Sequence, residues 1–300
     1  MKFHPGELEV QNRAGAQQEA GRNGAGIHAQ IPLPAFYFLQ QKQFVFAGFT
    51  DLSGNVWCSI LTGKPGFLQA SGADTIIIQL SASADPLLIQ QPGCEEDLGL
   101  LVIDFATRRR MRFNGRAQLD GDRIVLRTRE VFGNCPRYIQ MRSIAETREI
   151  VSLSDGSTTS ETLAPAQVEL IKKSDTFFIA TAFKETGADV SHRGGMPGFV
   201  QVLSPSLLAW PDYDGNKMFQ TLGNLSVNSA AGLTFLDFDS GETLQLTGTT
   251  EILWDEEAIH NFAGAQRIIR FAIWHAIATR NAVPFTWKFL EYSPFNPQQK

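Results

Sequence analysis

Two groups of polar residues in the second half of the chain have the types and spacing to hold an anion. Ser191, His192 and Arg193 stand together at the end of a strand-like segment. Further along, Asn216 and Lys217 close a turn rich in Asp, Gly and Asn that opens into a short helical segment. A helix start presents free backbone N–H groups at the positive end of the helix dipole, and lysine and arginine add charge. The two groups therefore predict a clamp for a phosphate-like dianion.

The same residues also allow less specific interpretations. Arg193 could pair with Asp189, and Lys217 could be a solvated charge on a helix. His192 beside Ser191 suggests nucleophilic catalysis, but neighbours on a strand point to opposite faces. The sequence also has no G-x-S-x-G motif, which argues against a hydrolase. We favour a ligand site because these groups cluster in one half of the chain.

That half has a counterpart, because the chain contains an internal duplication. Matching segments recur in the same order at an offset of 132 or 133 residues, so they need only single-residue gaps. Two unrelated domains would not agree in this collinear way. The matching pairs are Phe44–Ala47 with Phe177–Ala180, Ser59–Phe67 with Ser191–Phe199, Gly99–Phe105 with Gly232–Phe238, and Gly115 with Gly248.

The two copies differ where the anion clamp is expected. At the positions of His192 and Arg193 the first copy has Ile60 and Leu61, and the stretch around Ser81–Pro86 lacks any lysine or arginine. After duplication, a half that still binds a ligand must keep the polar groups that contact it. A half with only a structural role can lose those groups. The first copy has its own basic run, Arg108–Arg110 with Arg112. We interpret this run as a solvated hairpin turn rather than as an anion site.

Both copies are expected to be mainly β. Short strands separated by turn residues are typical of a barrel or sandwich. Helical segments are expected near residues 6–20, 134–145 and 217–224. We divide the chain into an N-terminal helical extension (1–30), a first barrel (31–150) and a second barrel (165–300). The expected strands are Phe44–Thr50, Val56–Leu61, Thr75–Leu80, Gly99–Phe105, Arg110–Leu119 and Arg123–Val131, then Thr176–Phe183, Ala188–Arg193, Phe199–Leu203, Leu207–Trp210, Gly232–Asp237, Glu242–Leu253 and Ile268–Ala278.

Composition limits the class of protein. The chain has 300 residues, 43% of them hydrophobic and 19% charged, which is typical of a folded globular protein. Its net charge of −5 argues against a general nucleic-acid binder. Three cysteines without metal-type spacing suit a reducing compartment. The scattered histidines predict no metal site. With no membrane-length apolar stretch and no signal-peptide pattern, we expect a cytoplasmic protein.

The longest motifs resemble those of one known family. The runs S-H-R-G-G-M-P-G-F-V from Ser191, W-P-D-Y-D-G-N-K from Trp210 and G-L-T-F-L-D-F from Gly232 are similar to FMN-binding split barrels related to pyridoxamine 5′-phosphate oxidase. The runs F-H-P-G-E-L-E-V-Q from Phe3 and G-N-C-P-R-Y-I-Q from Gly133 resemble a two-barrel branch of that family. The resemblance covers nearly the whole chain. It implies two tandem split β-barrels with flanking helices, packed as an intrachain pseudo-dimer.

The resemblance also implies a cofactor site. In that family FMN lies in a groove between two barrels, and one barrel holds its phosphate. The duplicated chain would then have one functional groove. The residues implied to bind FMN are Ser191, His192 and Arg193 along the ribityl–phosphate chain and ring edge, Pro211 and Asp212 at the ring or ribityl chain, and Asn216 and Lys217 at the phosphate. Thr243 and Gln245 lie on the strand expected to reach the flavin, with one face of it, and Arg137 and Tyr138 are the residues implied from the first barrel.

The function implied is that of an FMN-dependent oxidoreductase acting with a small-molecule substrate or electron donor. The chain has one arginine where the oxidase has an arginine-rich strand, so the resemblance does not specify pyridoxamine phosphate. A flavin- or haem-binding module without turnover, acting as a carrier or sensor, is the alternative, and a scaffold that has lost its ligand is a third. Association of two chains into a homodimer is left open.

Overall fold

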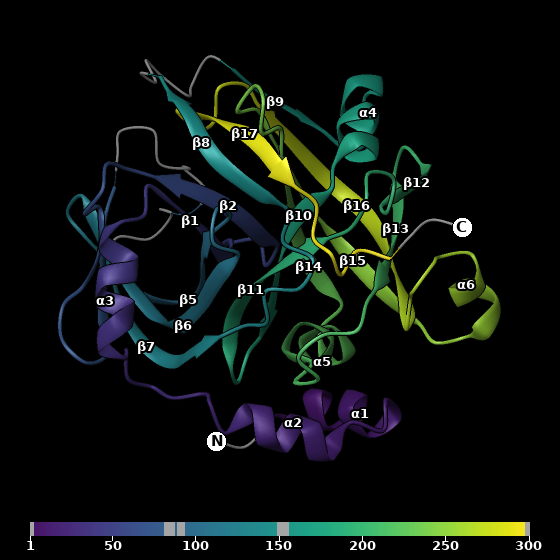
Figure 1. Ribbon diagram of the computed structural model, residues 1–300, viewed down its shortest axis with the longest axis horizontal. Helices are drawn as coiled ribbons and strands as arrows, with labels where there is room; N and C mark the ends of the chain where they lie inside the picture. The colour runs from purple at the N-terminus through teal and green to yellow at the C-terminus, as the bar shows by residue number, and fades with distance from the viewer. Residues whose placement is uncertain (1–2, 81–87, 89–93, 149–155, 298–300) are drawn as a thin grey trace.

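The computed structural model describes residues 3–80, 88, 94–148 and 156–297. Residues 81–86 are the stretch of the first copy that aligns with the turn containing Lys217. They lie outside the described residues. Within them, no helix has both the length and the apolar character needed to cross a bilayer. Two large β-sheets, one from each half of the chain, lie side by side with helices around them, and residues 141–147 and 285–291 form a third, two-stranded sheet (Figure 1).

The two halves have the same sheet topology, which confirms the tandem split-barrel prediction. The strand order is β2-β1-β5-β6-β7-β4-β3 in the first sheet and β11-β10-β14-β15-β16-β13-β12 in the second. The first sheet contains β1 (Phe44–Thr50), β2 (Val56–Thr62), β3 (Leu68–Ala70), β4 (Thr75–Gln79), β5 (Glu95–Asp104), β6 (Arg109–Asp120) and β7 (Arg123–Gly133). The second contains β10 (Thr176–Phe183), β11 (Gly187–Gly194), β12 (Gln201–Ser204), β13 (Leu207–Asp212), β14 (Ala230–Leu236), β15 (Thr243–Leu253) and β16 (Arg267–Thr279).

The matched glycines Gly115 and Gly248 show why the repeat preserves certain residues. Each lies at a register shift, Gly115 between β6 and β7 and Gly248 between β15 and β16. A Cβ added to Gly115 would lie 1.9 Å from a carbonyl oxygen of β7, and one added to Gly248 would lie 2.0 Å from a carbonyl oxygen of β16. Only glycine lets the backbones approach this closely at the bulge.

The hairpin registers correct one expected alignment. Ala47 pairs with Ser59 in the first half, and Ile179 pairs with Ser191 in the second. Ala47 therefore corresponds to Ile179, at an offset of 132 residues, rather than to Ala180. The correction matters because a shift of one residue moves every side chain of a strand to the other face.

The halves pack around a pseudo-twofold axis. Phe46 and its counterpart Phe178 are fully buried, and their rings stack with centroids 3.4 Å apart. On either side, Gly99 lies against the backbone of β11 and Gly232 against that of β2. A Cβ on either glycine would lie 2.6 Å from a carbonyl oxygen of the other half. These contacts join the separate cores of the two halves.

The helices and linking strands differ from expectation in several places. A single helix expected near residues 6–20 is instead a pair, broken at Gly15 with φ +64°. The helix expected near 134–145 is wrong: residues 134–140 are irregular and a strand follows, because its pairing partner lies near the C-terminus. The remaining elements are α1 (Pro5–Arg13), α2 (Gln17–Gly24), α3 (Leu33–Gln40), β8 (Met141–Thr147), β9 (Ser157–Ser160), α4 (Pro165–Lys173), α5 (Gln220–Val227), α6 (Glu256–His260) and β17 (Phe285–Glu291).

Candidate functional site

A cleft between the two halves brings most of the predicted site residues together. The cleft is partly open to solvent, and residues of both halves line it. Strands β6 and β11 and the β13–α5 turn form its walls. The first half contributes Arg110, Arg112, Asn134, Cys135, Arg137 and Tyr138. The second half contributes Ser191, His192, Arg193, Gly194, Phe199, Pro211, Asp212, Tyr213, Gly215, Asn216, Lys217, Phe219, Gln220, Thr221 and Leu222.

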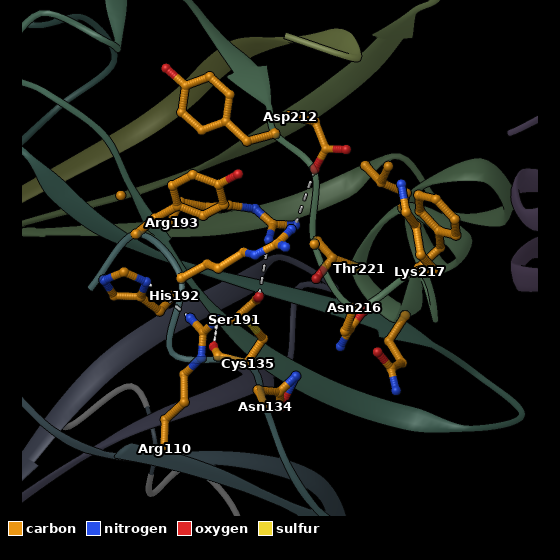
Figure 2. Close-up of a pocket in the computed structure, with 18 of the residues that line it drawn as sticks. Arg110, Asn134, Cys135, Ser191, His192, Arg193, Asp212, Asn216, Lys217 and Thr221 are labelled. Carbon is orange, nitrogen blue, oxygen red and sulfur yellow. Dashed lines mark hydrogen bonds and ion pairs between the residues drawn. The ribbon is translucent and has the colours of Figure 1, made fainter. Parts of the chain in front are cut away.

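Arg193 is held from two sides at the centre of this cleft. Its Nη1 donates to Ser191 Oγ at 3.3 Å, and its Nη2 lies 3.9 Å from Asp212 Oδ1 (Figure 2). Asp189, the alternative partner considered from the sequence, instead binds Arg112 at 2.8 Å. Arg193 thus has one distant carboxylate and a neutral hydroxyl as neighbours, which leaves much of its charge available to a ligand.

The turn between β13 and α5 places Asn216, Lys217 and the start of α5 on the same cleft. Lys217 and Phe219 both have left-handed backbone conformations, with φ of 61° and 62°. The helix begins at Gln220, so Lys217 precedes the helix rather than lying in its first turn as expected. Lys217 forms an ion pair with Asp214. No side chain among the described residues caps the start of α5, and its first N–H groups remain available to an anion.

Two arginines of the first half were missed by the sequence analysis. Arg110 and Arg112 are not part of a solvated hairpin: Arg112 is 4% exposed, and both side chains reach the cleft from β6. Arg112 donates to Asp189 at 2.8 Å and to Ser191 Oγ at 2.7 Å. The available signal was their i, i+2 spacing, which places both side chains on the same face of a strand.

Arg137 and Tyr138, which the resemblance implied at the cofactor, also line the cleft, and both bind Asp214. Arg137 forms an ion pair with Asp214, and the Tyr138 hydroxyl donates to the Asp214 carbonyl oxygen at 2.9 Å. The Tyr138 ring lies against that of Tyr213, with centroids 5.1 Å apart. This contact links the first half to the β13–α5 turn and gives an aromatic surface to the cleft that Arg193 also lines.

Gln245 lies elsewhere, which corrects its predicted position in the site. It does not line the cleft, and its Nε2 donates to Ser59 Oγ at 2.8 Å and to the Cys58 carbonyl oxygen at 3.1 Å. Thr243 is likewise absent from the described cleft lining. By strand register Gln245 corresponds to Arg112, whose contact with Ser191 is the pseudo-symmetric equivalent. The sequence alone did not show which half's strand would reach which groove.

His192 is held as a neutral imidazole. Burial, followed by the nearby charges of Arg110 and Arg193, lowers its pKa well below the ordinary value. Arg110 Nη1 lies 3.0 Å from His192 Nδ1. Since a guanidinium can only donate, Nδ1 accepts and the proton is on Nε2. Burial and the charges of Arg112 and Arg193 likewise lower the pKa of Arg110, as expected where positive charges are crowded.

Several buried polar atoms at the cleft lack a hydrogen-bond partner among the described residues. They are Arg110 Nε, Arg112 Nε, Asn134 Oδ1 and His192 Nε2. Buried donors and acceptors are rarely left unsatisfied, so this group indicates a site built for a polar ligand. In the described part of the chain no cluster of three or more His, Cys, Asp or Glu could hold a metal ion.

Comparison with known proteins identifies the family of the second half. Residues 163–288 match the family described as pyridoxamine 5′-phosphate oxidase. The second half of the chain belongs to this oxidase-related family. The matched span includes β10 to β16 and the whole β13–α5 wall of the cleft. No curated protein matches the chain.

Three of the solved structures that are similar to this chain each cover about two fifths of it. A putative pyridoxamine 5′-phosphate oxidase from Lactobacillus delbrueckii is 20% identical, with 40% of this chain and 98% of that chain covered and a TM-score of 0.34. An FMN-binding protein from Syntrophomonas wolfei is 11% identical, covering 37% and 84%, with a TM-score of 0.30. A FAD-binding protein from Mesorhizobium loti is 12% identical, covering 42% and 99%, also with a TM-score of 0.30.

Proposed function

We propose that the cleft binds FMN and that the protein is an FMN-dependent oxidoreductase. One observation carries the proposal: Arg193, Lys217 and the uncapped start of α5 meet in one cleft, beside an aromatic surface and unpartnered buried donors. A ligand that combines a dianion with a flat, hydrogen-bonding ring system would match all of these features. FMN is such a ligand, and FMN- and FAD-binding proteins are among the similar structures.

The phosphate is assigned to the α5 side of the cleft. Lys217, the Asn216 side chain, the Thr221 hydroxyl and the first N–H groups of α5 all line that side. Arg193 adds a guanidinium that can bind phosphate oxygens in a bidentate way. The ion pair between Lys217 and Asp214 would loosen or be shared when a dianion binds, because phosphate offers the stronger charge.

The ring system is assigned to the surface where the two halves meet. Tyr138 and Tyr213 give it an aromatic wall, and Pro211 adds an apolar contact. Neutral His192, with its proton on Nε2, can donate a hydrogen bond without adding charge to an already cationic cleft. Arg110 is held by His192 and by the Cys135 carbonyl oxygen at 2.6 Å, so its guanidinium is oriented before any ligand arrives.

Bound FMN would supply the electron-transfer chemistry itself. The protein's part is to bind the cofactor, orient it and exclude water. Arg110, whose partners His192 and the Cys135 carbonyl oxygen are neutral, would favour negative charge on the bound cofactor, because positive charge in a buried site stabilises negative charge strongly. This chemistry requires no protein nucleophile, and the substrate or electron donor would be a small molecule that enters the open side of the cleft.

Direct binding tests the cofactor. Purified protein should be yellow or should quench FMN fluorescence on titration. Arg193→Ala and Lys217→Ala should each weaken FMN binding by about tenfold or more, the loss expected for a charge-assisted hydrogen bond. Lys172→Ala, which removes an exposed lysine paired with Glu169, is the matched control. A colourless protein that leaves FMN fluorescence unchanged would rule out the proposal.

Turnover needs a separate measurement, because a flavin carrier or sensor would bind FMN equally well. Anaerobic addition of NADH or NADPH should bleach the bound flavin, and an added electron acceptor should restore its colour. If FMN binds but neither donor reduces it and no acceptor reoxidises the chemically reduced form, the non-catalytic alternative holds. Haem in place of flavin would be evident from an intense Soret band in the absorption spectrum.

A further inference from the structure

The N-terminal helices α1 and α2 lie beneath α5, on the far side of the turn that carries Lys217 (Figure 1). They belong to neither barrel, and the FMN assignment gives them no role. Their opening sequence was one of the longest motifs in the chain, yet none of its residues lines the cleft. Their contacts instead concentrate on the β13–α5 turn and on α5 itself.

Two side chains of this helical pair bind the backbone of the turn. Gln11 Nε2 donates to the Met218 carbonyl oxygen at 3.0 Å, and Asn23 Nδ2 donates to the Asn216 carbonyl oxygen at 2.7 Å. Gln11 is 1% exposed, so its hydrogen bond does not compete with water. The two bonds bracket Lys217 in the chain, one on the residue before it and one on the residue after.

The turn needs such support because its backbone is strained. Lys217 and Phe219 both occupy the left-handed region, which residues other than glycine seldom adopt and which persists only when surrounding contacts enforce it. The Met218 side chain, at the centre of the strained stretch, is 3% exposed and packs in one cluster with Ile27 and Phe132. The segment following α2 therefore holds the turn through packing as well as through hydrogen bonds.

The helices are also fixed against α5 at very short range. A Cβ added to Gly6 would lie 2.2 Å from the Gly223 carbonyl oxygen, and one added to Gly223 would lie 2.7 Å from the Glu7 Cα. Glycine on both sides lets the two backbones touch. A shift of α1 would therefore also move α5 and the turn that precedes it.

We propose that α1 and α2 form a clamp that holds Asn216 and Lys217 in their ligand-binding geometry, with Gln11 and Asn23 as positioning residues. Neither residue lines the cleft. Because coupling between two sites is reciprocal, a ligand at Lys217 must in turn stabilise the docked state of the helices. The coupling to a ligand rests on the proposed FMN site. The support of the turn by Gln11 and Asn23 does not depend on which ligand binds.

The structural part is tested first, without ligand. Gln11→Met keeps the buried volume and removes the donor, and Asn23→Ala removes an exposed side chain. Hydrogen exchange of residues 213–220 should accelerate at least threefold in both variants. Gln17→Ala is the matched control, because Gln17 makes an exposed hydrogen bond to Asn12 within the helical pair and none to the turn in the described structure. Unchanged exchange in both variants would overturn the clamp, whether or not the protein binds FMN.

The coupling is tested by titration with FMN. Each variant should raise the FMN Kd about fivefold, the usual worth of one net hydrogen bond, while Gln17→Ala leaves it unchanged. In the wild-type protein, saturating FMN should slow hydrogen exchange of residues 5–24. A purely structural role would lower thermal stability without these two effects. If wild-type protein does not bind FMN, the proposed cofactor fails; if it binds but Kd and exchange do not respond, the coupling fails.

Discussion

At the scale of single residues, the duplicated positions Arg112 and Gln245 show how the two halves diverged. Each reaches across the pseudo-twofold axis to a serine of the other half, Arg112 to Ser191 and Gln245 to Ser59. The geometry of the contact is common to both, but only Arg112 also carries a charge, and only its side of the axis has the buried carboxylate of Asp189. The two contacts are therefore geometrically equivalent, and only the one made by Arg112 adds positive charge to a cleft.

Replacing Arg112 by glutamine gives the first half the residue that its counterpart, Gln245, provides in the second half. Arg112→Gln should lower the free energy of unfolding by about 3 kcal/mol, because the buried Asp189 carboxylate loses its cation. Adding Asp189→Asn should recover most of the loss, since the Asn114 side chain still donates to position 189. Denaturant unfolding of both variants measures the effect. An equal loss in the single and double variants would contradict it.

At the scale of elements, helix α1 buries a carboxyl group at its N-terminal end. Glu7 accepts from the His4 backbone N–H at 2.8 Å in a capping box. Burial, with smaller effects from Glu130 and Asp189, raises the pKa of Glu7 to about 8. The clamp helix therefore carries an ionisable group whose charged state its surroundings oppose.

This carboxyl makes stability depend on pH. Between about pH 4.5 and pH 8 the unfolded chain releases the Glu7 proton while the folded chain keeps it, so folding stability falls as pH rises through that window. Glu7→Gln keeps the capping box and removes the titration. The variant should gain on the order of 3 kcal/mol over wild type between pH 5 and pH 8. Urea unfolding at both pH values tests this, and an unchanged difference between the proteins would refute it.

At the scale of the whole molecule, the two halves share a core that neither could form alone. Phe46 and Phe178 stack on the pseudo-twofold axis, and residues of both halves surround them. The candidate cleft opens along the same interface. Its walls come from β6 of one half and β11 of the other, so its shape depends on how the halves pack.

Truncating Phe46 should therefore destabilise both halves. Phe46→Ala should lower the free energy of unfolding by about 3–5 kcal/mol, as for other buried phenylalanines. Hydrogen exchange should accelerate in β10 of the second half as well as in β1. Phe113→Ala, within the core of the first half, serves for comparison, because its nearest effects should stay in that half. Acceleration confined to the first half in Phe46→Ala would show that the axis does not couple the two.

Much of the fold followed from local patterns in the chain. Strand β1 begins and ends where expected, and β10 likewise, because each is a short, nearly continuous apolar run and turn residues follow it. Strand β8 was taken for a helix, since its pairing with β17 joins segments far apart in the sequence. The site residues were also predicted only in part. Comparison of the two halves pointed to Arg193 and Lys217, whereas Arg110 and Arg112 were interpreted as part of a solvated hairpin.

The sequence by itself determined the duplication, the β architecture and the half that carries the cationic turn, because these depend on residue types and their spacing along one chain. Only the tertiary structure decided which strand of the first half faces that turn, that Gln245 lies on the opposite side of the axis, and that α1 and α2 support the turn. The reason is physical. A strand's periodicity fixes which side chains share a face, but the packing of one half on the other decides what each face meets.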